Sequence, residues 1–413
     1  MIRRPSAILA LLTGLNFLNY LDRILVAAVL PKISEDLGLS KFEGGLLATV
    51  FLLGYFVTSP LFGAMADRGP RKGLIAMGVA VWSLATAASG LAGGLATMLL
   101  VRAVVGVGEA SYATLAPTII DDITPPDKKG KALAIFYLAT PIGSAMGFVL
   151  GGLIESAWGW RAVFFVAGGP GILLALLCLL IEEPKRQLAT TRVSVIDSAK
   201  QLLLIPLYRR TVGGYIAHTA AVGAFAHWAP TFLHDRYGMD LKPATFWFGV
   251  VTVVSGAIAT VVGGRWVDRA LARYPSTGDH DHPSTRAGTN ALLRICAIGV
   301  AFAAPFTVAA FASPSPIGFF ILVFFVELGI FLSTSPVNAA LLRTVPAGLR
   351  ASSMAVAIFG IHIFGDLGSP PAVGLLQDHL PIVAAMMALP VLIAVAALVW
   401  WPRRREALAD PSG

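Results

Sequence analysis

The stretch Gly63-Ala-Met-Ala-Asp67-Arg68-Gly69-Pro70-Arg71-Lys72 is a short charged segment between two apolar runs, and part of it recurs later in the chain. The second copy is Gly264-Arg-Trp-Val-Asp268-Arg269, in which both the glycine and the aspartate stand 201 residues after their counterparts. Each copy follows the second apolar run of its half of the chain. A local signal repeated at a fixed offset predicts two related halves in parallel orientation.

Apolar runs continue outward from both copies and fill most of the chain. Of the 413 residues, 56% are hydrophobic and only 13% are charged, where a soluble protein has roughly 25% charged residues. About 20 apolar residues form a helix long enough to cross a bilayer. We therefore predict an all-α membrane protein with twelve transmembrane helices in two six-helix bundles, at residues 7–30, 44–66, 73–92, 95–120, 131–154, 160–181, 211–233, 243–266, 290–311, 317–341, 351–375 and 381–401.

A long polar stretch near the middle of the chain separates six of these spans from the other six. It contains a short amphipathic piece at 193–204, which is typical of a linker at a membrane surface. The predicted organisation is an N-terminal bundle at 1–181, a cytoplasmic linker at 182–210, a C-terminal bundle at 211–401 and a cytoplasmic tail at 402–413.

The net charge of +8 reflects membrane topology. Most of the 31 lysines and arginines fall in one alternate set of loops and tails, and the other set holds only Lys32, Lys41, Arg161, Arg236 and Lys242. Because positive loops stay in the cytoplasm, both termini are expected there, in a bacterial-type inner membrane. The same distribution removes the argument for a nucleic-acid partner.

Ionisable side chains in the middle of a span are costly, so they tend to face a cavity or a partner. This sequence has few of them: Asp22, Arg23, Arg102, Glu109, Glu327 and Asp366, with His218, His227 and His362. These residues are therefore the first candidates for a transport site.

Helical spacing places Asn16, Asn19, Tyr20 and Arg23 on one face of the first span, and Asp22 borders that face. Residues 22 and 102 lie at similar predicted depths from opposite ends of their spans, which favours an ion pair between Asp22 and Arg102. That pair could be part of a transport site, or it could be a permanent structural ion pair.

Glu109 stands two helical turns beyond Arg102, and Tyr112 one turn further. Burial favours the protonated form of a carboxyl group, whereas a nearby guanidinium favours the ionised form. Asp22 and Glu109 are therefore the candidate proton carriers. We hypothesise that protonation of one of them releases Arg23 or Arg102 to hold an anionic head group, because guanidinium matches phosphate in bidentate geometry.

The second half offers fewer candidates. Glu327 either lines a cavity or is hydrogen-bonded within the bundle. His362 and Asp366 are one helical turn apart and so can interact. They either take part in substrate binding or form a structural hydrogen bond. His218 and His227 are expected to be packing residues or cavity lining rather than metal ligands.

The charged loop, its partial copy and Arg102-x-x-x-Gly106 resemble signature motifs of the major facilitator superfamily, over the whole chain. A narrower resemblance, to the spinster-like branch, lies in Asn19-Tyr-Leu-Asp22-Arg23, in Gly106-Val-Gly108-Glu109-Ala-Ser-Tyr112 and in His362-Ile-Phe-Gly365-Asp366-Leu-Gly-Ser369-Pro370. That branch moves lysophospholipids and sphingosine phosphate, so the resemblance implies a single-chain amphiphilic substrate. It also implies gating by Gly63, Asp67, Arg68, Arg71, Lys72, Asp268 and Arg269, although the second copy lacks the Gly-Arg-Lys ending.

The full hypothesis is a monomeric, proton-coupled secondary transporter that works by alternating access and binds substrate at Asn19, Tyr20, Arg23, Arg102, Tyr112, Glu327, His362 and Asp366. Its partners are the amphiphile, protons and membrane lipids. We expect no cofactor, metal or ATP, since no Walker sequence occurs. The alternatives are a proton-coupled antiporter of organic anions or drugs, a membrane receptor that does not cycle, and a lipid enzyme, for which no residue constellation argues.

Glycines in the spans are expected to serve helix packing. Gly143, Gly147 and Gly151 follow one another at four-residue spacing, and Gly106 and Gly108 lie in the fourth span. Small residues at such positions let membrane helices approach closely. Pro117, Pro141 and Pro336 are expected to kink their spans.

Overall fold

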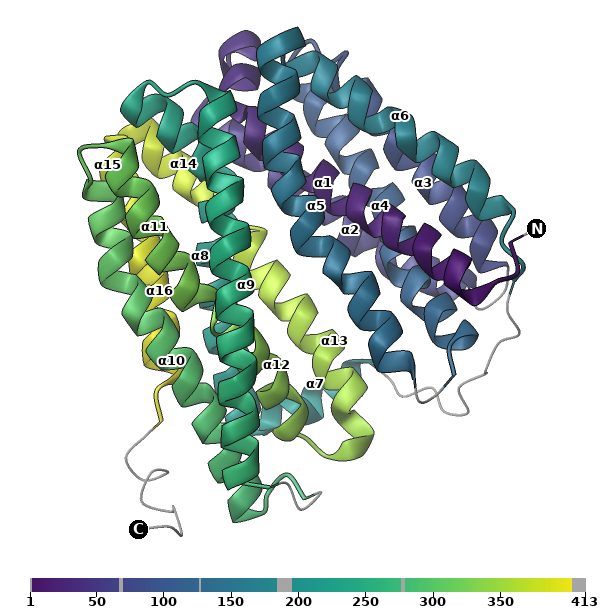
Figure 1. The fold of residues 1–413 in the computed structure, drawn as a ribbon, viewed down its shortest axis with the longest axis vertical. Coiled ribbons are helices and arrows are strands. Elements are labelled where there is room, and N and C mark those ends of the chain that lie inside the picture. Colours follow the sequence, from purple (N-terminus) through teal and green to yellow (C-terminus); the bar gives the residue numbers. More distant parts are fainter. Residues whose placement is uncertain (1, 67–69, 126–127, 184–194, 276–278, 403–413) are drawn as a thin grey trace. The chain divides into compact units, whose positions relative to one another are not determined.

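The structure is a computed structural model that describes residues 2–66, 70–125, 128–183, 195–275 and 279–402. Its first-half helices are α1 (Pro5–Leu37), α2 (Lys41–Ala66), α3 (Arg71–Ser89), α4 (Leu95–Ile123), α5 (Lys129–Trp158) and α6 (Trp160–Leu179) (Figure 1). Then come α7 (Val195–Leu204), α8 (Pro206–Tyr237), α9 (Leu241–Arg273), α10 (Pro283–Ala312), α11 (Pro316–Phe331), α12 (Thr334–Arg343), α13 (Arg350–Ile361), the π-helix η3 (His362–Asp366), α14 (Ser369–His379), α15 (Ile382–Met386) and α16 (Ala388–Trp400).

The described residues contain eleven helical segments that are long and apolar enough to cross a membrane. Helix α8 is not among them, because charged and histidine side chains lower its hydropathy, but its 32 residues are long enough to span. Together these segments account for all twelve predicted spans. The all-α prediction is confirmed for the described part of the chain, in which two residues of an isolated bridge, Ile2 and Ile181, form the only extended pairing.

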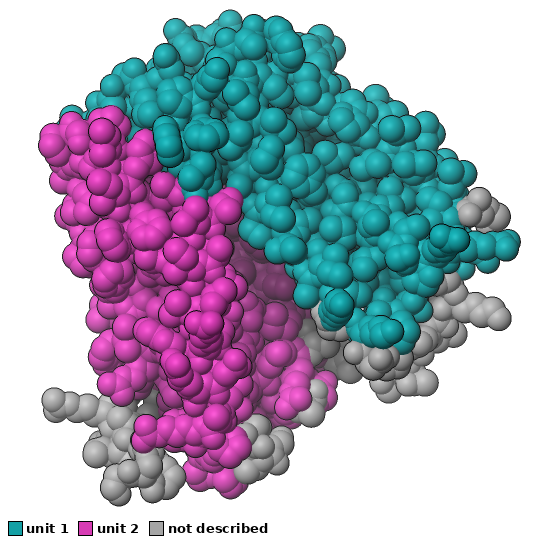
Figure 2. All heavy atoms as spheres, viewed as in Figure 1, with its two compact units in different colours: residues 1–189, 227–250, 370–379 teal, residues 190–226, 251–369, 380–413 magenta. Residues whose placement is uncertain are grey.

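The chain forms two compact units, coloured separately in Figure 2. Unit 1 comprises residues 1–189, 227–250 and 370–379, and unit 2 comprises 190–226, 251–369 and 380–413. Unit 1 therefore contains the six first-half helices together with the C-terminal part of α8, the start of α9 and α14. The predicted bundle boundaries at 1–181 and 211–401 stay a prediction.

Glycines set the close helix contacts of unit 1. A Cβ atom on Gly143 would lie 2.4 Å from the Phe17 carbonyl oxygen, and one on Gly147 would lie 2.7 Å from the Leu21 carbonyl oxygen, so α5 packs directly on the α1 backbone. Helix α4 approaches α2 in the same way, since a Cβ on Gly106 would lie 2.0 Å from the Phe51 carbonyl oxygen. The prediction that small residues mediate helix packing is confirmed at these positions.

Three predicted spans are interrupted rather than continuous. Helix α11 ends before Leu332. In a continuous helix the Leu332 carbonyl would accept from the N–H of residue 336, but Pro336 has no N–H to donate. Pro390 leaves the carbonyl of Met386 without its partner in the same way, between α15 and α16. The eleventh span changes to a π-helix at η3, shortly before Pro370. π-Turns inside membrane helices often accompany functional sites.

The amphipathic piece predicted in the linker is α7. In unit 2 its Leu202 is fully buried in a cluster with Tyr208 and Leu341, whereas Leu203 and Leu204 are exposed. Tyr208 at the start of α8 also donates to the Ser353 carbonyl, 2.8 Å away. Helix α7 is therefore anchored to unit 2 by one face and presents apolar side chains on the other.

Candidate functional site

An ion pair between α1 and α4 lies at the centre of the predicted site in unit 1. The Nε atom of Arg23 donates to Oε2 of Glu109 over 2.8 Å. The Glu109 side chain is 0% exposed, whereas Arg23 retains 20% of its surface. The pair thus has a buried acidic end and a basic end that reaches accessible space.

Aromatic rings hold the Arg23 guanidinium in place. Its central carbon lies 5.0 Å from the ring centre of Tyr20, 5.2 Å from that of Phe51 and 5.0 Å from that of Tyr55. Cations are attracted to aromatic faces at such distances. The guanidinium of Arg102 lies 5.1 Å from the same Phe51 ring, so both arginines share one wall.

The predicted Asp22–Arg102 ion pair is not formed as a direct contact. Asp22 accepts instead from the Thr86 hydroxyl on α3, 2.8 Å away. Arg102 interacts electrostatically with both Asp22 and Glu109. The ion pair that does form joins Glu109 to Arg23, the residue that follows Asp22 on α1. The positions of Asp22 and Arg102 along their spans predict similar depths in the membrane. Depth alone does not predict whether Arg23 or Arg102 pairs with a given carboxyl group.

Several buried polar atoms near this pair have no hydrogen-bond partner among the described residues. They are Oδ1 of Asp22, Nε and Nη1 of Arg102, Oε1 of Glu109 and Nδ2 of Asn19. Arg102 is only 2% exposed, and Asn19 only 1%. Buried polar atoms are normally paired, so a group of unpaired ones concentrated in one place is a feature of sites that receive water or a ligand.

Tyr112 has a different surrounding from the other candidates. It is fully buried, and its hydroxyl donates to the Leu12 carbonyl of α1, 2.5 Å away. Asn16 on the polar face of α1 likewise donates to the Phe136 carbonyl of α5. These two side chains connect helices. The structure therefore brings together Tyr20, Asp22, Arg23, Arg102 and Glu109, with Asn19 nearby on the same face of α1.

Three residues of the site were not found by sequence reasoning: Phe51, Tyr55 and Thr86. Phe51 and Tyr55 stand one turn apart on α2, and this spacing is a weak signal of a shared face. Lipid-facing aromatic residues give the same pattern, so the sequence alone does not distinguish the two.

In unit 2, Glu327 on α11 is hydrogen-bonded to α9. Its two carboxyl oxygens accept from the hydroxyls of Thr252 and Ser255, each over 2.8 Å, and it is 3% exposed. Of the two readings left open by the sequence, the geometry matches a hydrogen bond within the bundle.

The predicted His362–Asp366 contact is present in η3. Nδ1 of His362 lies 2.9 Å from both carboxyl oxygens of Asp366. Helix α8 passes closely, since a Cβ on Gly223 would lie 2.5 Å from the Asp366 Cβ. Both side chains remain partly exposed, His362 at 30% and Asp366 at 19%.

The other two histidines contact backbone carbonyls. His218 lies 3.2 Å from the Ile330 carbonyl in unit 2, and His227 lies 3.2 Å from the Gly44 carbonyl in unit 1. Within the described residues, no group of three or more His, Cys, Asp and Glu side chains is arranged to hold a metal ion.

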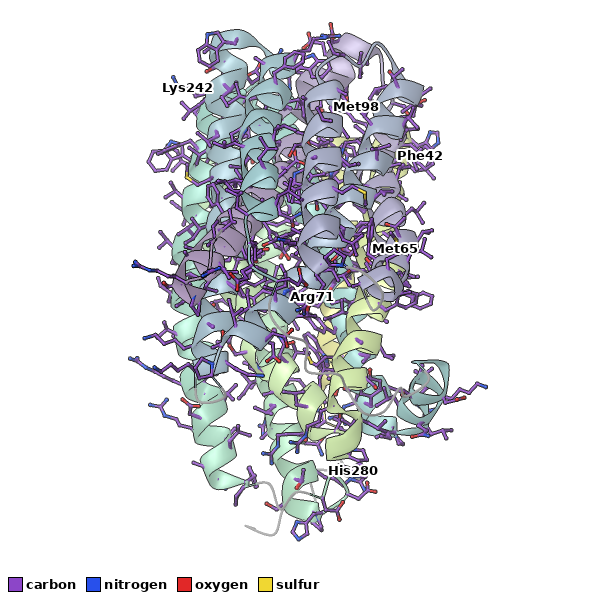
Figure 3. The ribbon with its side chains drawn as sticks, turned by 90° about the vertical axis from the view of Figure 1, so that its right-hand side faces the viewer. Phe42, Met65, Arg71, Met98, Lys242 and His280 are labelled. Carbon is purple, nitrogen blue, oxygen red and sulfur yellow. The ribbon has the colours of Figure 1, made fainter. Side chains whose placement is uncertain are left out.

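In the predicted gating loop, Asp67 and Arg68 lie outside the described residues. Arg71, labelled in Figure 3, is 5% exposed and connects three helix ends. Its Nη1 lies 2.7 Å from Asp122 at the end of α4, and its Nε lies 3.1 Å from Glu183 beyond α6. Glu183 also accepts from the backbone N–H groups of Arg71 and Lys72 and so caps α3.

A Cβ atom added to Gly63 would have Thr114 as its nearest neighbour, 4.0 Å away. Close packing therefore does not require a glycine there. In the second copy, Asp268 and Arg269 are exposed on α9.

At the opposite end of unit 1, near Phe42 in Figure 3, a carboxylate caps α2 from a remote part of the chain. Asp378 on α14 accepts from the backbone N–H of Lys41 over 2.8 Å and from that of Phe42 over 2.9 Å. The Lys41 ammonium pairs with Asp235 on α8. Because Gly374 has no side chain, α14 approaches the Lys41 carbonyl closely. We call Lys41, Asp235 and Asp378 the terminal clasp.

The family model described as Major Facilitator Superfamily matches residues 12–369. Protein spinster homolog 1 of Xenopus laevis is 32% identical over 92% of this chain and 74% of its own length. The probable sphingolipid transporter spinster homolog 2 of Arabidopsis thaliana is 32% identical over 91% of this chain and 81% of its own length.

Solved structures share the fold. A bacterial homologue of the human lysosomal transporter spinster, in an inward-facing and unoccupied conformation, has a TM-score of 0.84 at 22% identity, over 98% of both chains. A D-xylose–proton symporter has a TM-score of 0.78 at 18% identity, over 96% of this chain and 97% of its own. The predicted twelve-helix architecture is confirmed by these matches.

Proposed function

The chain belongs to the spinster-type transporters of the Major Facilitator Superfamily, and we propose that it moves a single-chain lipid with a phosphate head group in exchange or together with protons. It is a multi-pass membrane transporter and not an enzyme. The observation that carries the proposal is the Arg23–Glu109 ion pair, in which a partly exposed base is held by a fully buried acid.

The head group binds at the two arginines. Arg23 offers further N–H donors beyond the one given to Glu109, and Arg102 has two buried nitrogen atoms without a partner among the described residues. A phosphate oxygen is the acceptor that guanidinium groups bind best. Tyr20, Phe51 and Tyr55 keep the Arg23 guanidinium in position, which lowers the entropy lost on binding.

Protons enter through the carboxyl groups. When an anionic head group takes over Arg23, Glu109 loses its counter-charge in a buried environment, and a proton then stabilises it as the neutral acid. Asp22 lies in the same electrostatic cluster through Arg102, and we assign it the second proton-carrying role. Phosphate binding and proton uptake are thereby coupled at one ion pair.

The remaining candidates complete the path. We assign Asn19 and Tyr20 to the head-group end and Tyr112 to holding α1 and α4 in register. Glu327 is assigned to holding α9 and α11 together, and His362 and Asp366 are assigned to the part of the path that the second half contributes. Their partial exposure at η3 supports this assignment for the His362–Asp366 pair.

Alternating access requires contacts that open and close at both ends. We assign the inner gate to Gly63, Asp67, Arg68, Arg71 and Lys72 with Asp268 and Arg269, and the outer gate to the terminal clasp. The excess of lysine and arginine in one set of loops supports cytoplasmic termini in a bacterial-type inner membrane. We propose that the transporter is a monomer.

Flux measurements in proteoliposomes test the proposal. Uptake of lysophosphatidylglycerol, sphingosine phosphate and a tail-less organic anion is compared, with and without an imposed pH gradient. We expect uptake of the two lipids, accelerated by the gradient, and little uptake of the organic anion. Preferential uptake of the tail-less anion would instead favour the organic-anion antiporter, and saturable lipid binding without flux would favour the receptor.

A further inference from the structure

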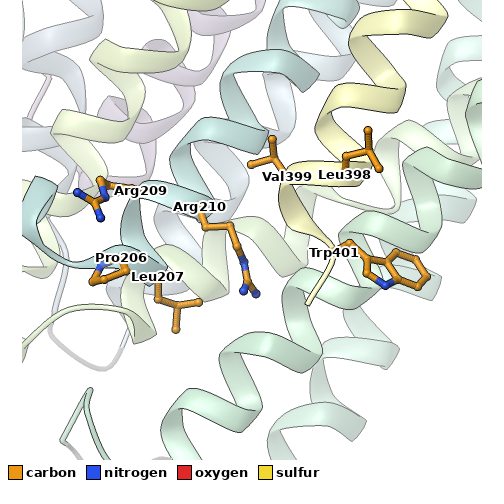
Figure 4. A pocket seen from close by; sticks show the side chains of 7 residues that line it. All are labelled: Pro206, Leu207, Arg209, Arg210, Leu398, Val399 and Trp401. Atoms are coloured by element: carbon orange, nitrogen blue, oxygen red, sulfur yellow. The ribbon is translucent and has the colours of Figure 1, made fainter. Parts of the chain in front are cut away.

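A cavity of about 450 Å³ opens in unit 2, where the start of α8 meets the end of α16 (Figure 4). From α8 it is lined by Leu207, Arg209 and Arg210, and from α16 and its end by Leu398 and Trp401. Its two walls are fixed to each other, because the Trp400 indole N–H donates to the Thr211 carbonyl over 3.0 Å. This cavity lies outside the ion-pair site of unit 1.

The α8 wall carries two arginines. Arg209 closes the first turn of the helix and Arg210 begins the second, and the first turn contains no acidic residue. The N-terminal end of a helix adds positive potential of its own. Arg210 is oriented by a hydrogen bond to the Asn290 side-chain oxygen on α10, while Arg209 is exposed. Figure 4 shows Arg210 on the side of α8 that faces the α16 wall and Arg209 on the other side, so Arg210 is placed to contact a phosphate oxygen and Arg209 adds positive charge nearby.

The α16 wall is apolar and continues along the helix. Val391, Val395 and Leu398 stand at intervals of four and three residues, and their exposed fractions are 62%, 41% and 76%. This spacing forms a single stripe on one face of α16. The stripe reaches Trp401, which is 49% exposed, and the sequence continues with Arg403, Arg404 and Arg405. A tryptophan at the end of a span marks the level of the lipid head groups.

From these two walls we propose that the cavity binds the head group of an anionic two-chain phospholipid from the surrounding membrane. The phosphate lies against Arg210, with the positive charge of Arg209 nearby, and one acyl chain lies along Val391, Val395 and Leu398. The basic pocket matches the head group of such a lipid, and the apolar stripe beside it matches an acyl chain. A free phosphate would use the basic pocket alone. The site stands independently of the proposed transport function.

Thermal unfolding of the purified full-length protein in neutral detergent tests the site. Mixed micelles with dioleoylphosphatidylglycerol are compared with dioleoylphosphatidylcholine and with glycerol 3-phosphate. We expect phosphatidylglycerol to raise the midpoint of unfolding, phosphatidylcholine to raise it less, and glycerol 3-phosphate to leave it unchanged at equal concentration. Equal stabilisation by glycerol 3-phosphate would overturn the lipid assignment.

Variants locate the effect. Arg209→Gln together with Arg210→Gln should weaken phosphatidylglycerol binding about tenfold or more. The matched control is Arg286→Gln together with Arg294→Gln, which removes the same charge from exposed positions of α10. Arg209→Gln alone serves if the double variant does not fold, because Arg209 is exposed. Stabilisation that survives in the Arg209 and Arg210 variants, or that is lost equally in the control, contradicts the proposal.

The transport site is a second place where a lipid could bind, so a further variant separates the two. Arg23→Gln removes the base of the ion pair in unit 1 but leaves both walls of this cavity intact. The phosphatidylglycerol effect should persist in Arg23→Gln. Its disappearance there would place the lipid at the transport site and overturn the inference.

Discussion

Arg23 and Glu109 form a 2.8 Å ion pair in which the acid is fully buried and the base is partly exposed. A carboxylate in that position depends on the arginine paired directly with it, because removing one partner of a buried pair leaves the other uncompensated. Whatever draws Arg23 away therefore changes the proton affinity of Glu109. In the proposed mechanism, Arg23 is the contact for substrate and Glu109 is the contact for the proton.

The first prediction concerns the proton. Glu109→Gln keeps the shape of the side chain but cannot take up a proton, so lysophosphatidylglycerol uptake into proteoliposomes should no longer respond to a pH gradient. Glu155→Gln, at the end of α5, is the matched control and should respond like the unmodified protein. Gradient-driven uptake that persists in Glu109→Gln would remove the residue from the coupling mechanism.

The second prediction concerns the head group. Arg23→Lys keeps the positive charge but loses the bidentate geometry and the flat face that packs among Tyr20, Phe51 and Tyr55. We expect binding of lysophosphatidylglycerol to weaken about tenfold, as measured by thermal stabilisation at increasing ligand concentration. Unchanged affinity would mean that the guanidinium does not touch the phosphate.

The third prediction concerns helix packing. Gly106→Ala places a Cβ 2.0 Å from the Phe51 carbonyl oxygen, so α2 and α4 must separate. The expected cost is about 1–3 kcal/mol, seen as a lower midpoint of thermal unfolding. Gly14→Ala is the control, since no atom lies within 4 Å of its Cβ position. Equal stability of the two variants would refute the close approach of the helices.

The fourth prediction concerns the terminal clasp. Asp378→Ala removes both acceptors of the first N–H groups of α2, and the loss of a helix cap costs about 1 kcal/mol. The midpoint of thermal unfolding should fall in Asp378→Ala. It should fall less in Asp378→Asn, because the asparagine keeps one oxygen acceptor. Identical midpoints for Asp378→Ala and the unmodified protein would show that the cap carries no stabilisation.

The spans and their packing glycines could be read from the sequence because both follow from local physics. Hydropathy over about 20 residues identifies a span, and the four-residue spacing of Gly143 and Gly147 identifies a contact face. The interruptions at Pro336 and Pro390 are also local, and Pro336 was expected to kink its span. The π-turn at His362–Asp366 was not foreseen, and neither was the close approach of α8 to this turn, where a Cβ on Gly223 would lie 2.5 Å from the Asp366 Cβ.

The site was predicted as a set of residues but not as a set of contacts. Scarcity of intramembrane charge identified Asp22, Arg23, Arg102 and Glu109. Which side chains pair depends on how each helix is rotated about its axis. In the structure, α1 directs Arg23 toward Glu109 of α4, whereas Asp22 points toward Thr86 of α3. The aromatic wall from α2 was missed because aromatic residues are equally common on lipid-facing surfaces.

Proton uptake on ligand binding tests the central claim most directly. Lysophosphatidylglycerol is suited to the measurement because its phosphodiester does not titrate near neutral pH. Added to the purified protein in weakly buffered solution, it should cause uptake of about one proton per site, and by linkage its affinity should fall as pH rises. Glu109→Gln should bind the lipid without taking up a proton. The account is contradicted if the unmodified protein binds the lipid with no proton uptake, or if Glu109→Gln takes up as many protons as the unmodified protein.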